Sequence, residues 1–148
     1  MTVALPGEVY FDPAFVFHDG QVGEKLFVVL CDSPLDPNAV VVARTTSVNK
    51  GEYVVGVESS GEMEGCHSGA FVPNYFLPAP QNKFTKNTWL LFDDIYEYGD
   101  EEFRQLGWKV TLELDLALTI SVMSCASQSS HVPGWAQKQL IKQLEKMK

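Results

Sequence analysis

Basic residues are scarce in this 148-residue chain: 11 Lys and Arg stand against 19 Asp and Glu, giving a net charge of −8. Domains that hold nucleic acid by bulk electrostatics are usually basic, so this balance argues against that class. The charge is uneven, because Trp135 to Lys148 carries +3 and the other residues carry −11. An acidic chain is better suited to binding small molecules or basic partners, or to a binding site whose local charge differs from that of the whole chain.

Cysteine is also scarce. The odd count of three, Cys31, Cys66 and Cys125, shows no CxxC spacing, which argues against a disulfide framework and a four-ligand zinc site. We interpret Cys31 and Cys125 as core thiols, because both lie among apolar residues. The N-terminus lacks a basic start followed by an apolar run, and no stretch predicts a membrane-spanning helix. We therefore expect a cytoplasmic protein without membrane association.

Motifs for cofactors and metals are missing as well. The sequence has no P-loop, no GxGxxG and no nucleophile elbow. His18, His67 and His131 are far apart in sequence and show none of the i, i+4 pairing that a helical metal site needs. We expect no metal and no other cofactor.

What is present is a series of short strand patterns followed by helix patterns. Residues 25–31 and 39–43 are dense apolar runs, typical of strands buried on both faces. Residues 108–114 alternate and predict a strand with one apolar face. Further strand candidates are 8–11, 53–57, 88–95 and 71–77, the last an edge strand because it contains Pro73.

Three helices are predicted. An acidic first turn and Gly107 predict a short helix near 100–106. Asp115 can cap a helix with an apolar stripe of Leu116, Ile120 and Met123, and another helix starts near Pro133. The fold class is therefore α+β, with a compact barrel or half-barrel. We expect a single domain, in which residues 1–114 form the barrel core and 115–148 form two helices packed on it.

Polar residues lie where two buried strands begin or end. Lys25 starts one, and Arg44-Thr45-Thr46-Ser47 ends the next. A cation with hydroxyls can bind a phosphate and stabilise its developing charge. On residue types alone the structural alternative is favoured, since charges often flank strands and threonines often bond to the backbone in turns.

Several segments resemble, in order and spacing, the MazF/PemK (Kid) family of toxin endoribonucleases. The family pattern is P-G-[DE]-[IV]-[YW], then G-x-R-P before an apolar strand, then V-x-[VA]-x-x-[ST]-[ST]. The matching segments here are Pro6-Gly7-Glu8-Val9-Tyr10, Gly23 to Leu30 and Val40 to Ser47. Phe84 to Ile95 resembles a later family segment, so the likeness covers about residues 6–106.

The resemblance implies an SH3-like β-barrel that forms a homodimer and cleaves single-stranded RNA without a metal. In this chemistry the 2′-OH attacks the adjacent phosphate, leaving a 2′,3′-cyclic phosphate and a 5′-hydroxyl. Lys25 occupies the position of the family's catalytic arginine, and Thr46 that of its catalytic threonine. The residues expected to bind the RNA are His18, Arg44, Thr45, Ser47 and Lys50. An antitoxin partner is also implied.

The departures from the family pattern leave alternatives open. Lys25 is a point charge where the family has a planar guanidinium, and Arg44 can supply one instead. Tyr96 lies where the family often has an arginine, beside Asp93, Asp94 and Glu97. These carboxylates form either a solvated surface or, in the functional interpretation, a site for a basic partner. The chain is therefore either a ribonuclease, an inactive barrel of this type that binds a basic protein, or an acidic immunity-type or inhibitor protein. Whether it is an enzyme stays open.

Overall fold

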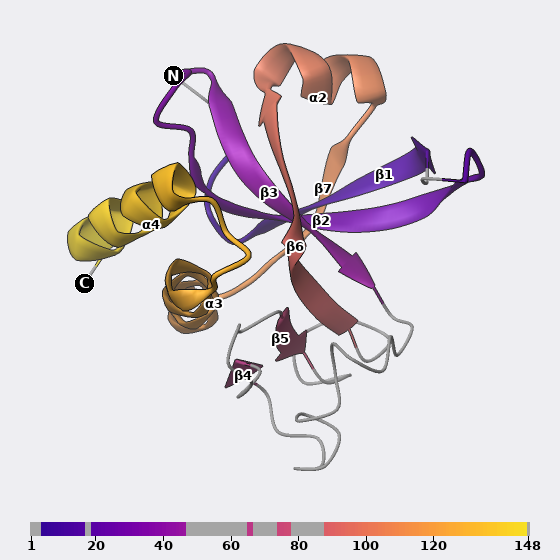
Figure 1. The fold of residues 1–148 in the computed structure, drawn as a ribbon. Coiled ribbons are helices and arrows are strands. Elements are labelled where there is room, and N and C mark those ends of the chain that lie inside the picture. The colour runs from indigo at the N-terminus through magenta and orange to yellow at the C-terminus, as the bar shows by residue number, and fades with distance from the viewer. Residues whose placement is uncertain (1–3, 17–18, 47–64, 67–73, 78–87, 148) are drawn as a thin grey trace.

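The computed structural model describes residues 4–16, 19–46, 65–66, 74–77 and 88–147. The elements are β1 (Glu8–Val16), β2 (Val22–Asp32), β3 (Ala39–Thr46), β4 (Gly65–Cys66), β5 (Asn74–Leu77), β6 (Thr88–Gly99), α2 (Asp100–Leu106), β7 (Lys109–Glu113), α3 (Leu116–Gln128) and α4 (Gly134–Met147). The predicted α+β class is confirmed: a curled antiparallel sheet forms a half-barrel, and α3 and α4 follow it in the chain (Figure 1). Within the described ranges, no helix has the length and apolar content needed to cross a membrane.

In the described residues the strand order is β4-β5-β6-β3-β2-β1-β7, with every neighbouring pair antiparallel. The two apolar runs predicted from the sequence lie in β2 and β3 at the centre of this sheet, buried as expected. The pairings of β1 with β2, of β2 with β3 and of β3 with β6 each contain a register shift. Such irregularities bend strands and increase their twist, which accounts for the curl of the sheet.

One face of the sheet, here called the helix-covered face, packs against α3 and α4. Helix α4 contacts β2, and α3 contacts β2 and β5. The buried residues that meet there include Val28, Leu30, Val41, Ala43, Leu90 and Phe92 from the strands and Val122, Met123, Leu140 and Leu144 from the helices. These side chains form the larger apolar core of the described chain.

The opposite face, here called the aromatic face, is built from rings. Its members are Tyr10, Phe15, Phe27, Tyr96, Tyr98, Phe103 and Trp108. Trp108 stacks on Phe27 with 4.5 Å between ring centroids and on Phe103 at 5.3 Å. Helix α2 supplies Phe103, its one buried residue, and so attaches to this face.

Pro6 and Gly7 form a turn before β1, and this turn has a packing reason. Gly7 has a φ of 91°, which L side chains rarely adopt, and its N–H donates to the Val29 carbonyl at 2.9 Å. A Cβ atom at Gly7 would clash with the hydroxyl of Thr119 in α3. The glycine therefore lets the N-terminal segment approach both the sheet and α3.

The helix ends follow the sequence signals. Gly107 follows α2 with a φ of 70°, and the Asp115 carboxylate accepts from Leu118 N–H at 2.8 Å. Helix α4 begins directly after Pro133, as predicted. The predicted stripe of α3 is confirmed for Met123, which is buried, and for Ile120, which packs against the core, but it is wrong for Leu116, which is 62% exposed. Apolar residues occur on nearly all sides of α3, so their spacing does not select one face.

Two strand predictions are corrected. The predicted edge strand at 71–77 is represented by β5, which lies between β4 and β6. The one-sided pattern of 108–114 fails within β7, where Val110 is 43% exposed. A register shift opposite Val9 and Tyr10 breaks the alternation, and β7 is an edge strand paired only with β1. The strand predicted at 53–57 lies outside the described residues.

The cysteine prediction is also corrected. Cys125 is not a free thiol: it forms a disulfide with Cys66, joining α3 to β4 across a sequence separation of 59. Cys31 is the buried free thiol that was predicted, and burial raises its pKa to about 12. The count of three therefore reflects one disulfide and one core thiol, an arrangement that sequence spacing does not reveal.

Candidate functional site at the β2–β3 strand ends

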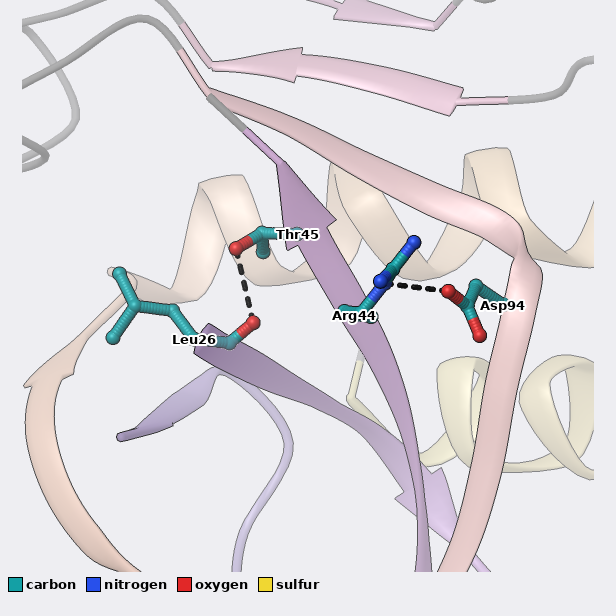
Figure 2. Close-up of polar contacts among 4 residues, drawn as sticks. All are labelled: Leu26, Arg44, Thr45 and Asp94. Carbon is teal, nitrogen blue, oxygen red and sulfur yellow. Dashed lines mark hydrogen bonds and ion pairs between the residues drawn. The ribbon is translucent and has the colours of Figure 1, made fainter. Parts of the chain in front are cut away.

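The two residues predicted to be catalytic lie on neighbouring strands. Phe27 of β2 is directly opposite Arg44 of β3, and the Thr45 hydroxyl donates to the Leu26 carbonyl at 2.9 Å (Figure 2). The paired register of β2 and β3 ends at Phe27 and Arg44, and Lys25 and Thr46 each lie two residues beyond that pair, at the same end of the two strands. Because side chains alternate along a strand, both belong to the same face as Phe27 and Arg44.

The burial of these residues differs. Lys25 is half-buried, whereas Thr46 is only 2% exposed and pairs with Trp89 of β6. Thr45, predicted to bind substrate, is 3% exposed and uses its hydroxyl on the backbone of β2. Figure 2 shows Thr45 and Arg44 projecting to opposite sides of β3, so the structure does not bring these two side chains together.

Arg44 forms an ion pair with Asp94 of β6, with 2.5 Å between Nε and Oδ2 (Figure 2). The two side chains are 15% and 17% exposed, so the pair is largely shielded from water. The guanidinium also lies 5.7 Å from the centre of the Phe15 ring, within cation–π range. A residue predicted to bind RNA and one predicted to bind a protein partner thus contact each other.

Two tyrosines extend this polar group along β6. Burial, together with a hydrogen bond to Asp94, raises the pKa of Tyr96, while Arg44 opposes that shift. Burial also raises the pKa of Tyr98, and Glu102, Asp12 and Asp94 add to it in that order. Both hydroxyls therefore hold their protons at neutral pH and serve as hydrogen-bond donors.

Asp12 is a further member that the sequence analysis did not identify. Its carboxylate is 3% exposed, accepts from Ala14 N–H at 2.9 Å, and lies opposite Lys25 in the β1–β2 register. In the sequence Asp12 precedes Pro13, a pair typical of a turn or a break in a strand. The alternation of Asp94, Tyr96 and Tyr98 was a usable signal, since period-2 spacing places all three on one face of a strand.

The remaining predicted residues are separated from this group or not described. Asp93 and Glu97 are exposed, and Glu97 accepts a hydrogen bond from the Ser33 hydroxyl. Alternation along β6 places Glu97 on the face opposite Tyr96, so the acidic triad is divided between two faces. His18, Ser47 and Lys50 lie outside the described residues.

A groove of about 670 Å³ lies between α2, β7 and β1, away from Lys25 and Thr46. Its lining includes the aromatic residues Tyr10, Phe103 and Trp108 and the charged residues Asp100, Arg104 and Lys109. The two regions are connected through the aromatic face, because Phe27 contacts Trp108 and lies opposite Arg44.

Chemically, the β2–β3 site combines two cations, two carboxylates, a threonine hydroxyl and two tyrosine hydroxyls on one sheet face. Cations and hydroxyls are the groups that bind oxyanions in proteins, and one of the two cations, Arg44, is paired with Asp94. Among the described residues, no group of His, Cys, Asp or Glu is arranged to hold a metal ion. No model of a known protein family matches the chain, and no curated protein matches it.

Proposed function

We propose that the protein is a toxin-like endoribonuclease of the MazF/PemK type, whose half-barrel is a variant of the SH3-like barrel. The observation that carries the proposal is that Lys25 and Thr46 each lie two residues beyond the Phe27–Arg44 pair, at the same end of β2 and β3 and on the face that also holds Arg44. Rigid strands hold such groups at fixed separation better than loops do. The sequence resemblance supplies the reaction.

In the proposed reaction the RNA 2′-hydroxyl gives its proton to water as its oxygen bonds to phosphorus, and the 5′-oxygen takes a proton from water as its bond to phosphorus breaks. Lys25 and Thr46 stabilise the negative charge that develops on the phosphoryl oxygens. Because Thr46 is 2% exposed, substrate entry requires the residues over it to move. Arg44 contributes directly only when it leaves Asp94, and otherwise fixes the edge of the site through that pair.

The test is cleavage of long single-stranded RNA in the presence of a metal chelator. We expect products with 2′,3′-cyclic phosphate ends, and at least a 100-fold lower rate in Thr46→Val and Lys25→Ala. Thr46→Ser restores the hydroxyl and should recover activity. Lys109→Ala and Thr111→Ala are matched controls, because both residues are exposed on β7. The proposal fails if the wild type leaves RNAs of varied sequence intact, or if Thr46→Val cleaves normally.

A second function is favoured by the Arg44–Asp94 ion pair, which neutralises a guanidinium that RNA would need. In this alternative the chain binds a basic protein, such as an antitoxin, through exposed carboxylates including Asp93 and Glu97. Calorimetric titration with a lysine-rich peptide tests it, with Glu97→Gln expected to weaken binding. This alternative is excluded if the protein cleaves RNA and does not bind the peptide.

The proposal also includes a homodimer in the cytoplasm, both following from the resemblance and the sequence. Sedimentation velocity checks the dimer, whose expected mass is twice that of the chain. The Cys66–Cys125 disulfide counts against the cytoplasm, because thiols there are normally kept reduced. Fractionation of the producing cells, with alkylation of free thiols, separates the two locations.

A further inference from the structure

Helix α4 carries an exposed basic stripe made of Trp135, Lys138, Lys142 and Lys146. At about 100° per residue, these four side chains lie within about 80° of one another around the helix axis. The buried residues Ala136, Leu140 and Leu144 lie on the opposite side. Figure 1 shows α4 at the outside of the molecule beside α3.

Folding does not explain this stripe. Among the described residues, no carboxylate lies within salt-bridge distance of the Lys138, Lys142 or Lys146 ammonium groups. The helix dipole favours a cation in the last turn, which accounts for Lys146 but not for Lys138 near the start. Trp135 is 38% exposed, although a tryptophan is normally buried where packing allows. The stripe concentrates positive charge on a chain whose other residues are strongly acidic.

We propose that the basic stripe of α4 binds the backbone of single-stranded RNA, with Trp135 stacking on an unpaired base. Lysines one turn apart are about 6 Å apart along the axis, a spacing suited to successive phosphates of one strand. An aromatic ring beside a line of cations is the combination that binds single strands without sequence preference. The inference rests on the proposed function in one respect, the choice of RNA as the polyanion.

Two other occupants fit less well. A membrane-surface helix inserts its apolar side, and in α4 that side is already packed against α3 and β2. The carboxylates of a second copy offer partners for the lysines, but the rings of its aromatic face stack mainly on one another and leave less planar surface for Trp135. A single strand offers both phosphates and bases, so it alone accounts for the lysines and the tryptophan together.

The test is fluorescence anisotropy with a labelled 2′-O-methyl RNA oligonucleotide, titrated at several salt concentrations. This oligonucleotide has no free 2′-OH, so binding is measured whether or not the protein cleaves RNA. Three phosphate contacts predict that log Kd rises with log salt concentration at a slope of about 2. Lys138→Gln with Lys142→Gln should reduce the slope by about 1.4 and weaken binding about tenfold at low salt.

The matched control is Arg104→Gln with Lys109→Gln, which removes the same charge from exposed residues of α2 and β7. This control should bind within about twofold of wild type, allowing for the general field of the protein. Trp135→Ala should weaken binding about tenfold, and Trp135→Phe should retain most of it. Gln has a helix propensity close to that of Lys, so thermal melts should stay unchanged.

Three outcomes overturn the inference. The first is equal weakening by the stripe and control variants, which means that only net charge matters. The second is binding of the lysines to phosphatidylserine vesicles but not to the oligonucleotide. The third is loss of a dimer in the stripe variant with oligonucleotide binding intact. If the protein does not cleave RNA but binds the oligonucleotide through the stripe, the proposed ribonuclease function is wrong and the inference about α4 is supported.

Discussion

The two faces of the curled sheet come from the same strands and have opposite chemistry. On the helix-covered face, β2 and β3 present Val28, Val41 and Ala43 to α3 and α4. On the aromatic face, alternate residues of the same strands present Phe27 and Arg44 to rings and ionisable groups. Alternation therefore lets one pair of strands build an apolar core and a polar site back to back.

Substitutions on the two faces should change the free energy of unfolding in different ways. The helix-covered face is closed by packing, so changes there should alter the free energy of unfolding through lost volume. The aromatic face holds charges that are partly shielded from water. The effect of a substitution there on the free energy of unfolding should therefore depend on charge and on pH. Substitutions can therefore separate an effect of lost packing volume from an effect of charge.

Leu140→Ala should have the largest effect, because Leu140 of α4 is fully buried on the helix-covered face. Truncation leaves a cavity and should lower the free energy of unfolding by about 2–5 kcal/mol. The neighbouring Ile141→Ala is the control: Ile141 is 49% exposed and should cost less than about 1 kcal/mol. Urea denaturation measures both. Equal costs would mean that α4 does not pack on the sheet in solution.

Reduction of the Cys66–Cys125 disulfide should remove the second anchor of the helix-covered face, which ties α3 to β4. We expect a loss of about 2–4 kcal/mol, because the bond closes a long loop in the unfolded chain. Alkylation of denatured protein should modify one thiol without reductant and three with it, since Cys31 is free. Cys66→Ser should be insensitive to reductant. Three reactive thiols in the untreated protein would show that the disulfide does not form.

Features fixed by neighbouring residues could be predicted from the sequence. The bounds of α2, the cap at Asp115 and the start of α4 after Pro133 depend on side chains within one helical turn. Buried β2 and β3 were also predictable, because their apolar runs leave no exposed face. The register shift opposite β7 was not, since it depends on the partner strand β1.

The candidate site shows the same division. Lys25 and Thr46 were found because each stands at the end of an apolar run and matches a family position. The pairing of Arg44 with Asp94 was missed because it joins residues that only the β3–β6 register brings together. The disulfide was missed for the same reason, and Asp12 because a carboxylate before a proline resembles an ordinary turn.

Asp94→Asn tests the charge on the aromatic face. Asn keeps the shape of the side chain but removes the partner charge of Arg44, so we expect a loss of about 1–2 kcal/mol. Glu101→Gln is the matched control, because Glu101 pairs with Arg104 where both side chains are about three-quarters exposed. That pair should contribute at most about 0.5 kcal/mol. Equal small effects in urea denaturation would mean that the Arg44–Asp94 pair is no better shielded than a surface pair.

Mildly alkaline pH should produce the smallest change in the free energy of unfolding. The two faces differ in the pH at which that change begins. Burial raises the pKa of Cys31 from 9.0 to about 12 on the helix-covered face, and that of Tyr10 from 10.0 to about 12 on the aromatic face. Both groups are protonated in both states below about pH 8, so they cause no change of stability with pH there. Above it the unfolded thiol loses its proton while the folded thiol keeps it, so unfolding releases protons and stability falls as pH rises. The unfolded tyrosine adds its share above about pH 10.

Two variants show which residue causes each fall of the unfolding free energy with pH. Cys31→Ala should flatten the fall in unfolding free energy between about pH 9 and 10, whereas Tyr10→Phe should leave that interval unchanged and reduce the slope only above about pH 10. Urea denaturation at about pH 8, 9.5 and 10.5 distinguishes them. If Cys31→Ala leaves the first interval unchanged, the thiol is not shielded by α3 and α4 as the structure requires. If Tyr10→Phe leaves the second unchanged, ionisation of Tyr10 does not separate the folded from the unfolded state.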